Sequence, residues 1–313
     1  MLPKLLITLG DVAGIGPEIV AKAWPQIQEY CEPVVVGDPS RLPSDVAFVN
    51  PCAVDLSTVP LGRVSAAAGQ AAYEWLVYAS DECIAGRADG VVTCPLHKEG
   101  LHAAGVPFPG HTEILAYRTN APFHAMLLYD EELPLAVAHV TLHEALRNVF
   151  EFLTVESVLD KIRLLNGIVP QLTGKPARIG VAAVNPHGSD GGLFGHEETE
   201  VLAPAIVAAR REGIAVEGPI PADAIFLPHN RVRFNGIVAM YHDQGHIAMK
   251  LLGGRRAVNV TAGLPIVRTS VAHGTGYDIA GKGVADETSL ISAVRVAARL
   301  VSARRKNTSN GSK

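Results

Sequence analysis

Short apolar runs alternate with longer segments of helical character along almost the whole of this 313-residue chain, and this alternation is what most constrains its fold. An apolar run followed by a helical segment, repeated many times, is typical of βαβ units. Such units build a mainly parallel sheet that is covered by helices. We therefore expect an α/β fold rather than a β-sandwich or a coiled coil.

The expected elements follow one another in that order. Strands are predicted at Lys4–Leu9, Pro33–Val36, Gly90–Thr93, Ala125–Leu128, Leu135–Ala138, Ile179–Ala183, Gly236–Met240, Ala257–Thr261 and Ile266–Thr269. Helices are predicted at Ala66–Ile84, Leu142–Phe150, Val155–Leu165, Glu197–Arg211 and Glu287–Ala303. Another helix should begin at Pro17-Glu18, because proline and an acidic residue both favour the first turn. The polar segment Arg304–Lys313 predicts a frayed tail.

Composition disfavours several classes of protein. Hydrophobic residues make up 48% of the chain and charged residues 19%, which suits a packed core and not a disordered chain. The net charge is −4, whereas a nucleic-acid-binding protein normally has a basic surplus. No apolar run is long enough to span a membrane, and the N-terminus reaches Gly10 and Asp11 too soon for a signal peptide. We expect a cytoplasmic protein that binds neither nucleic acid nor membranes.

Three histidines stand directly after apolar strands: His139, His187 and His242. Neutral imidazoles gathered from separate strand ends can hold a divalent transition ion and leave positions open for a substrate. The gaps between them are long, so that only the fold or a partner subunit can bring the three together. Ordinary loop or capping histidines are the alternative. His143 and His246, each four residues beyond a candidate, compete for the same role.

A second group of residues suits an anionic ligand: His111, Thr112, Lys250, Asn259 and Arg268. Arginine offers a bidentate fork of donors and lysine a point charge. The helix expected after Gly110 would direct free backbone N–H groups toward a phosphate. A capped helix with scattered surface charges is the alternative.

Two glycine-rich loops lie near opposite ends of the chain. The first runs from Gly10 to Glu18 and lacks the GxGxxG order, so the usual dinucleotide fingerprint is absent. The second, His273–Gly283, contains one histidine and one aspartate and suits a loop that wraps around an adenosine. It is otherwise simply a long loop before the last helix.

Taken together, these stretches resemble the 4-hydroxythreonine-4-phosphate dehydrogenase (PdxA-like) family. The matching segments are Gly10–Glu18, Thr93–Lys98, Phe108–Glu113, Asn185–His187, Pro221–Asp223, Tyr241–Gly245, Asn259–Pro265, Arg268–Ser270 and His273–Thr275. The loop His273–Gly283 also resembles the adenosine-binding loop of isocitrate and isopropylmalate dehydrogenases, whose fold the family shares. This chain departs from the family at Val12, where proline is usual, and at Ala272, where aspartate is frequent.

The resemblance implies two α/β/α domains with a cleft between them, as in isocitrate and isopropylmalate dehydrogenases. We expect residues 1–115 and 274–313 to form the first domain, with the cofactor loop. Residues 116–273 would form the second, with metal ligands, substrate ligands and dimer contacts. The resemblance also implies a homodimer whose active site is shared between the subunits.

Residue roles follow from the same resemblance. The metal ligands would be His139, His187 and His242, one of them from the partner subunit, around one zinc, magnesium, cobalt or manganese ion. The substrate would be bound by His111, Thr112, Lys250, Asn259, Arg268 and Asp223. NAD, or less readily NADP, would be bound by Gly10, Asp11, Gly14, His273, Gly274 and Asp278. Either Lys250 or Asp243 would move the proton.

The implied activity is that of an NAD(P)-dependent oxidoreductase of pyridoxine biosynthesis. It would oxidise the C3 hydroxyl of 4-(phosphooxy)-L-threonine to a β-keto acid, which decarboxylates to 3-amino-2-oxopropyl phosphate. The residues around His143 and His246 look closer to a branch that oxidises 4-phospho-D-threonate or 4-phospho-D-erythronate, and this is the alternative. A branch acting on aromatic dihydrodiols resembles the same residues but lacks the Gly-His-Thr and Arg-Thr-Ser segments kept here. A sugar-phosphate-binding protein without catalysis is the alternative of another class.

Overall fold

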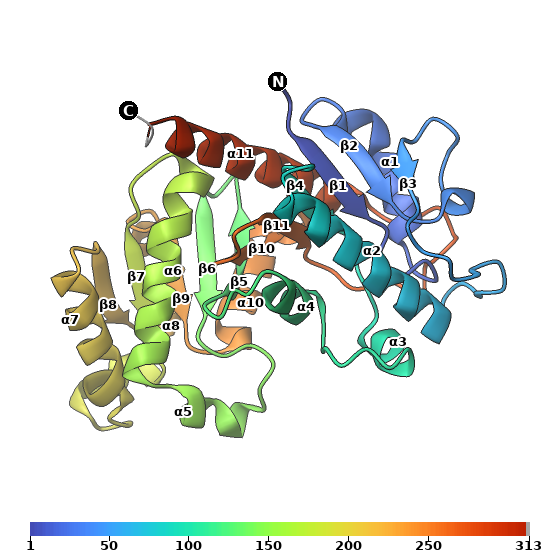
Figure 1. The fold of residues 1–313 in the computed structure, drawn as a ribbon. Coiled ribbons are helices and arrows are strands. Elements are labelled where there is room, and N and C mark those ends of the chain that lie inside the picture. Colours follow the sequence, from blue (N-terminus) through green and yellow to red (C-terminus); the bar gives the residue numbers. More distant parts are fainter. Residues whose placement is uncertain (311–313) are drawn as a thin grey trace. The chain divides into compact units, whose positions relative to one another are not determined.

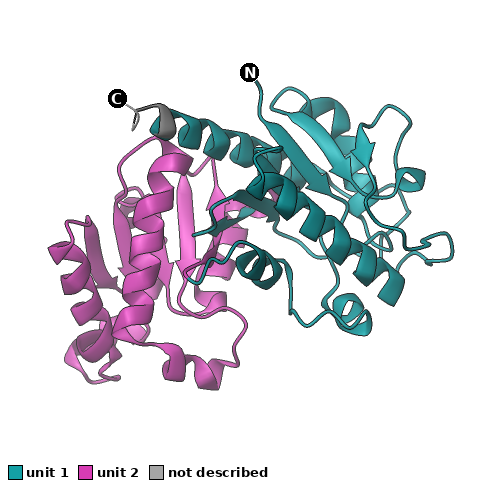
Figure 2. Cartoon of the chain, viewed as in Figure 1, with its two compact units in different colours: residues 1–122, 258–313 teal, residues 123–257 magenta. Residues whose placement is uncertain are grey.

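The computed structural model describes residues 1–310, which form two compact units (Figures 1 and 2). Unit 1 joins Met1–Pro122 to the C-terminal segment that begins at Val258, and unit 2 is Phe123–Ala257. Within each unit, neighbouring strands form a stretch of sheet with helices packed against it. Among residues 1–310, no helix combines the length and the apolar character that a membrane span needs.

The sheet of unit 1 has the strand order β3-β2-β1-β4-β11-β10. Its strands are β1 (Lys4–Thr8), β2 (Glu32–Val36), β3 (Phe48–Val49), β4 (Gly90–Thr93), β10 (Val258–Ala262) and β11 (Val267–Val271). Neighbours run parallel except β10 and β11, which are antiparallel. Every residue of β4 and β11 is buried, because helices cover both faces at the centre of the sheet.

Two groups of helices cover this sheet (Figure 1). Helix α2 (Ala66–Ile84) packs on β1 and β4 together with α3 (Lys98–Ala103) and α4 (His111–Arg118). Helix α11 (Thr288–Asn310) packs on β4 and β11 beside α1 (Gly16–Ile27). A 3₁₀ turn, η1 (Pro39–Arg41), follows β2.

The sheet of unit 2 has the order β5-β6-β9-β7-β8. Its strands are β5 (Ala125–Asp130), β6 (Leu135–His139), β7 (Ile179–Ala182), β8 (Val216–Ile220) and β9 (Gly236–Ala239). Only the β5–β6 pair is antiparallel among the pairs described within this sheet. The carboxyl ends of β6, β7 and β9 therefore lie at one edge, which is where open α/β sheets bind ligands.

Helices α6 (Val155–Thr173) and α10 (His242–Gly253) both pack on β6 and β9. The remaining helices of unit 2 are α5 (Val149–Phe152), α7 (Ala203–Arg211), α8 (Ala222–Ile225) and α9 (Pro228–Arg231). Short turns are η2 (Leu146–Asn148), η3 (Pro186–Gly191), η4 (Glu198–Leu202, a π turn) and η5 (Gly254–Arg256).

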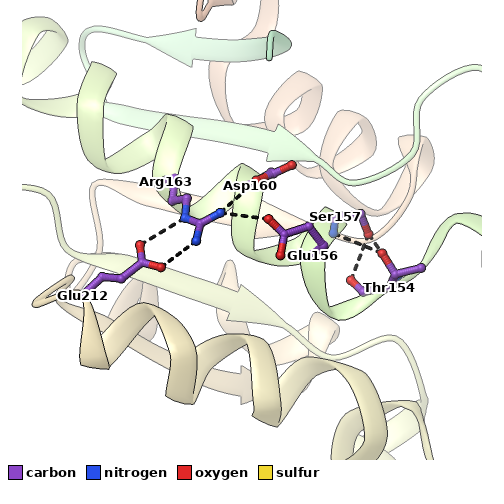
Figure 3. A network of polar contacts seen from close by, with 6 residues as sticks. All are labelled: Thr154, Glu156, Ser157, Asp160, Arg163 and Glu212. Carbon is purple, nitrogen blue, oxygen red and sulfur yellow. Dashed lines mark hydrogen bonds and ion pairs between the residues drawn. The ribbon is translucent and has the colours of Figure 1, made fainter. Parts of the chain in front are cut away.

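Polar contacts at the start of α6 fix where this helix begins and how it packs (Figure 3). Thr154 and Ser157 each accept a hydrogen bond from the other's backbone N–H, at 3.1 and 3.0 Å, which forms a capping box. Arg163 on the same helix pairs with Glu212 at 2.6 Å, just beyond the end of α7. Glu156, 2.9 Å from Arg163, extends this network. The network is exposed, so it specifies how α6 and α7 align more than it adds stability.

The expectation of an α/β fold is confirmed, and each predicted strand is present with its ends shifted by at most a few residues. Two strands were missed. Strand β3 has only two residues, and β8 contains Gly218-Pro219, a pair that argues against a strand. The helix predicted at Leu142–Phe150 was placed too early, because regular structure begins at Leu146. The helix predicted from Glu197 begins instead with a π turn at Glu198.

The frayed tail predicted from Arg304 was wrong as far as Asn310, because α11 continues to that residue. Arg304 donates to the backbone oxygens of Leu264 and Pro265 at 3.1 and 2.7 Å, and Arg305 pairs with Asp89 at 2.8 Å. These contacts hold the last turns against unit 1. Residues 311–313 of the predicted tail lie outside the described part of the chain.

The boundaries of the two units differ from those of the two expected domains. Residues 258–273, expected in the second domain, belong to unit 1, because β11 pairs with β4 and β10 pairs with β11. Residues 116–122 also belong to unit 1. Arg118, in the last turn of α4, pairs with Asp81 of α2 at 2.5 Å and holds this segment there. The expected cleft between the domains stays a prediction.

The close packing of α2 against α3 gives a testable prediction for stability. A methyl group at Gly69 in α2 would overlap the backbone carbonyl of Gly100 in α3, whereas no atom lies within 4 Å of one at Gly167 in α6. Gly69→Ala should lower the free energy of unfolding by about 1–3 kcal/mol. Gly167→Ala, the control, should raise it by about 0.5–1 kcal/mol through helix propensity. Urea denaturation measures both, and an unchanged Gly69→Ala would contradict the packing.

Candidate functional site

Arg268 is a buried cation in the sheet of unit 1, with 2% of its surface exposed. Its guanidinium donates to the hydroxyls of Thr93 and Thr261 at 2.9 Å each, and to Asn259 Oδ1 at 3.5 Å. Its Nε has no hydrogen-bond partner among the described residues. Burial lowers the pKa of Arg268 to about 10, so it still carries its charge at neutral pH. A buried guanidinium held by neutral oxygens is ready to bind an anion.

Helix α4 begins next to this cation. Its N-terminal residue is His111, and no side chain caps the N–H groups that follow Gly110. Burial and the charge of Arg268 lower the pKa of His111 well below its ordinary value, so the ring is neutral at pH 7. Unit 1 therefore gathers His111, Thr112, Asn259 and Arg268, four of the predicted substrate ligands. We call this set of residues the anion site.

Two residues of this region escaped the sequence analysis. Thr93 and Thr261 hold the guanidinium of Arg268 through their hydroxyls. Thr93 is the last residue of β4, directly before Cys94-Pro95, and Thr261 lies in β10. Their strand positions carry no signal that distinguishes them from packed core residues.

Four histidines gather in unit 2: His139, His143, His242 and His246, which we call the imidazole cluster. His139 ends β6, and its Nε2 lies 3.1 Å from Nδ1 of His246 in α10. The rings of His242 and His246 are stacked, with centroids 3.8 Å apart. The ring of His242 lies 6.5 Å from that of His139 and 6.4 Å from that of His143.

The electrostatics of the cluster favour neutral rings. Burial and the neighbouring histidines lower the pKa of His139 to about 3 and that of His246 to about 4. A neutral imidazole has the free lone pair that a metal ion needs. His139 Nδ1 is buried and has no hydrogen-bond partner within residues 1–310. Nevertheless, no group of three or more His, Cys, Asp or Glu residues within the described chain has an arrangement that could hold a metal ion.

His187 lies apart from the imidazole cluster. It lines a hollow of about 320 Å³ with Asp223, Tyr241 and Gln244. A second hollow of about 400 Å³ is lined by His143, His242 and Asp243, and Tyr241 borders both hollows. Two of the three predicted metal ligands, His139 and His242, therefore lie close together within one chain. The third, His187, lines a separate hollow together with Asp223.

The loop that carries His187 is strained. Every residue from His187 to Gly192 has a positive φ, between 45° and 100°, although His187, Ser189 and Asp190 are not glycines. The left-handed conformation costs roughly 1–2 kcal/mol for each such residue. Strain of this kind persists where the surrounding structure enforces it, and it concentrates at functional sites.

Glu198 holds the segment that leads into this loop. It is 3% exposed, and its Oε1 accepts the N–H groups of Val184 and Asn185 at 2.9 and 2.7 Å. Its Oε2 accepts the side-chain amide of Asn185 at 2.8 Å, two residues before His187. The sequence analysis missed Glu198. The only indication in the sequence is that Glu198 is an acidic residue in the first turn of a predicted helix, a position where a carboxylate can accept hydrogen bonds from free backbone N–H groups.

The two residues predicted to move a proton lie on α10. Asp243 Oδ1 is 2.6 Å from Nδ1 of His242, so Asp243 orients this ring. Lys250 is exposed two turns further along, and its charge contributes to the lowered pKa of His246. Both residues therefore border the imidazole cluster.

The predicted cofactor residues of the two glycine loops meet within unit 1. The N–H of Ile15 donates to Thr275 at 2.9 Å, and a side chain at Gly14 would overlap the same carbonyl. His273 and Asp278 are exposed, whereas Asp11 is buried and bonded to Tyr277 at 2.6 Å. The structure joins the loops but gives Asp11 an internal role.

The chain is similar in sequence to a described protein family and to named dehydrogenases. Residues 25–297 match the model of the family described as pyridoxal phosphate biosynthetic protein PdxA. The chain is 41% identical to D-threonate 4-phosphate dehydrogenase of Cupriavidus necator, over 97% of this chain and 98% of that one. It is also 41% identical to 4-hydroxythreonine-4-phosphate dehydrogenase of Beijerinckia indica, over 95% and 94%.

A solved structure is similar as well. The crystal structure of 4-hydroxythreonine-4-phosphate dehydrogenase from Klebsiella pneumoniae has a TM-score of 0.84 and 36% identity, and covers 96% of this chain and 99% of that one. The expected family and the dehydrogenase class of enzyme are thereby confirmed.

The role of Glu198 is open to a direct test. Glu198→Ala removes the acceptor of two backbone N–H groups, those of Val184 and Asn185, so the free energy of unfolding should fall by about 1–3 kcal/mol. Glu200→Ala, in the same π turn but exposed, should change it by less than about 0.5 kcal/mol. Limited proteolysis should show faster cleavage between residues 187 and 195 only in Glu198→Ala. Equal stability and cleavage in both variants would contradict the role.

Proposed function

Because the chain belongs to the family of the pyridoxal phosphate biosynthetic protein PdxA, we propose that it oxidises a phosphorylated four-carbon hydroxy acid with NAD. The observation that carries the proposal is the buried Arg268, a cation whose hydrogen bonds within residues 1–310 go to neutral oxygens. A phosphate offers it several charged acceptor oxygens, and each charge-assisted hydrogen bond is worth about 1.5–3 kcal/mol.

In this proposal the anion site binds the phosphate. Arg268 and Asn259 face it from adjacent strands, and the first turn of α4 adds the N–H groups around His111 and Thr112. The neutral state of His111 allows its ring to donate one hydrogen bond without adding a second buried charge. The phosphate is remote from the reacting hydroxyl, so its binding energy serves to orient that hydroxyl.

His139, His187 and His242 would hold a divalent metal. Their donor chemistry fits zinc, cobalt or manganese, and the neutral, buried ring of His139 is suited to coordination. When bound, such an ion is a Lewis acid that lowers the pKa of a coordinated hydroxyl. Asp243 would fix the ring of His242 by holding its Nδ1. Asp223, beside His187, would contact the substrate.

Lys250 would take the proton. Asp243 is already engaged with His242, and Lys250 lies on the same helix beside the imidazole cluster. Lys250 would accept the proton of the C3 hydroxyl, and NAD, when bound, would supply the acceptor for the hydride that leaves C3, so that the product would be a β-keto acid. Loss of carbon dioxide from this acid follows readily. Asp278 is exposed in the cofactor loop. Its carboxylate would accept hydrogen bonds from the ribose hydroxyls of NAD and would repel the 2′-phosphate of NADP.

The substrate proposed first is 4-(phosphooxy)-L-threonine, which would give 3-amino-2-oxopropyl phosphate. The second is 4-phospho-D-threonate or 4-phospho-D-erythronate. The contact of His246 with His139 favours this second candidate, since His246 belongs to the segment that resembles the phospho-sugar-acid branch. In both cases the phosphate and the neighbouring secondary alcohol are the groups recognised.

The protein is also proposed to be a homodimer with shared active sites. His187 lies outside the imidazole cluster of its own chain, so the third ligand would be His187 of the partner subunit. Two apolar side chains one turn apart on α10, Ile247 and Leu251, are 57% and 82% exposed. Exposed apolar side chains on the helix that begins with His242 are suited to such an interface.

Steady-state kinetics test the activity. NADH absorbance is followed with NAD, a divalent ion and paired phosphorylated and unphosphorylated acids. Arg268→Lys keeps the charge but loses the bidentate fork, so kcat/KM on the phosphorylated acid should fall by about 10- to 100-fold. The unphosphorylated acid should react poorly with either protein. No NADH from any acid would indicate a binding protein, and equal turnover of paired acids would show that Arg268 does not bind phosphate.

Subunit mixing tests the shared site. Exchanged dimers of inactive His139→Ala and His187→Ala should recover about a quarter to a half of the activity per mixed dimer, since one of its sites is intact. His139→Ala with His242→Ala is the control, because the two residues lie in one cluster of one chain and every mixed site loses a ligand. Recovery in the control, or none in the first pair with exchange demonstrated, would contradict this division of ligands.

A further inference from the structure

Asp11 and Tyr277 form a partly buried hydrogen bond between the two glycine loops. The phenol O–H of Tyr277 donates to Asp11 Oδ2 at 2.6 Å, and Asp11 Oδ1 accepts the N–H of Ala13 at 2.8 Å. Asp11 is 1% exposed. Both of its oxygens are thus engaged inside the protein, and it has no surface to offer a cofactor.

A third segment joins the pair. The ring of His97 stacks on that of Tyr277, with centroids 4.9 Å apart and planes 7° from parallel. His97 directly precedes α3, and the N–H of Asp11 donates to Pro95, just before it, at 2.9 Å. The Asp11–Tyr277 bond therefore fastens the C-terminal loop to two segments from the first hundred residues.

The far end of the loop is fastened separately. Glu18 in α1 accepts the N–H groups of Ala285 and Gly283 at 2.7 and 3.2 Å. Lys22 donates to the carbonyl oxygens of the same two residues at 2.6 and 2.9 Å. Between these contacts and the start of the loop, the backbone oxygen of Thr275 accepts the N–H of Ile15, and the side chain of Tyr277 bonds to Asp11, while its neighbour Asp278 is exposed.

The chemistry of the bond suits a permanent attachment. Burial and the carboxylate of Asp11 raise the pKa of Tyr277, so the phenol keeps its proton and remains a donor at physiological pH. A charged acceptor makes this one of the stronger classes of hydrogen bond. Many glycines in this loop give it a large conformational entropy when it is released.

We propose that Tyr277 and Asp11 are positioning residues, which hold the loop 273–283 in the shape that receives the adenosine part of the dinucleotide. The inference rests on the proposed function. Asp278 and His273 contact the cofactor, whereas Asp11 acts only through Tyr277. Without the Tyr277–Asp11 hydrogen bond, the loop loses conformational entropy only when the cofactor binds. The affinity for the dinucleotide therefore decreases by that entropic cost.

The first test is Tyr277→Phe in the full-length protein. The Kd for NADH, from its fluorescence, and the KM for NAD should both rise about tenfold, with kcat changed less than about twofold. Tyr129→Phe is the matched control, because it removes a buried hydroxyl that donates to Leu172 at 3.1 Å in unit 2. It should lower the melting temperature similarly and leave the Kd for NADH unchanged. An unchanged Kd in Tyr277→Phe would overturn the proposal.

A double-mutant cycle separates positioning from contact. Asp11→Ala should match Tyr277→Phe, and the double variant should bind NADH no more weakly than either one. Asp11→Asn, which retains an acceptor, should recover most of the affinity. If Asp11 touched the cofactor, the two losses would add, and the proposal would fail.

Hydrogen exchange gives a readout without cofactor. In Tyr277→Phe, amides of residues 273–283 should exchange at least about tenfold faster, while those of unit 2 keep the wild-type rate. Should the wild type not bind NADH at all, the proposed function fails and this measurement still decides whether Tyr277 holds the loop. Unchanged exchange in that segment would overturn the positioning role.

Discussion

The buried charge of Arg268 is the constraint on which the account of this protein depends. A guanidinium buried in a mainly parallel sheet loses its hydration, and here its hydrogen bonds go to the neutral oxygens of Thr93, Thr261 and Asn259, while the charge of Glu113 also favours it. A hydrophobic side chain of similar size would pack there at lower cost. The charge therefore makes sense as part of an anion site, to which α4 adds free N–H groups.

Unit 2 shows a different way of preparing a site. Here the rings of His139 and His246 are kept neutral by burial and by the neighbouring histidines, which suits coordination rather than binding of an anion. The loop at His187 adopts a left-handed backbone conformation that non-glycine residues disfavour, and Glu198 holds the two residues Val184 and Asn185 shortly before it. Each unit thus contains a feature that is unfavourable for folding: the buried charge of Arg268 in unit 1 and the left-handed loop at His187 in unit 2. Such features are typical of functional sites.

Much of the fold was predictable because the strands are short, apolar and separated by helical segments. The expectations failed where the signal was local and weak: β8 contains Gly-Pro, and the end of α11 is held by Arg304 and Arg305, whose partners are distant in sequence. Site residues that bear a distinctive side chain, such as Arg268 and His139, were found. Thr93, Glu198 and Tyr277 were missed, because they act through buried hydrogen bonds that no spacing reveals.

Stability of Arg268→Met, with and without inorganic phosphate, tests the central claim most directly. If Arg268 is retained for binding an anion, the variant should unfold at a free energy equal to or above that of the wild type in phosphate-free buffer. Phosphate should then stabilise the wild type and leave the variant unchanged. A variant that is less stable by more than about 2 kcal/mol, or that phosphate stabilises as much as the wild type, would show that Arg268 serves the fold and not the ligand.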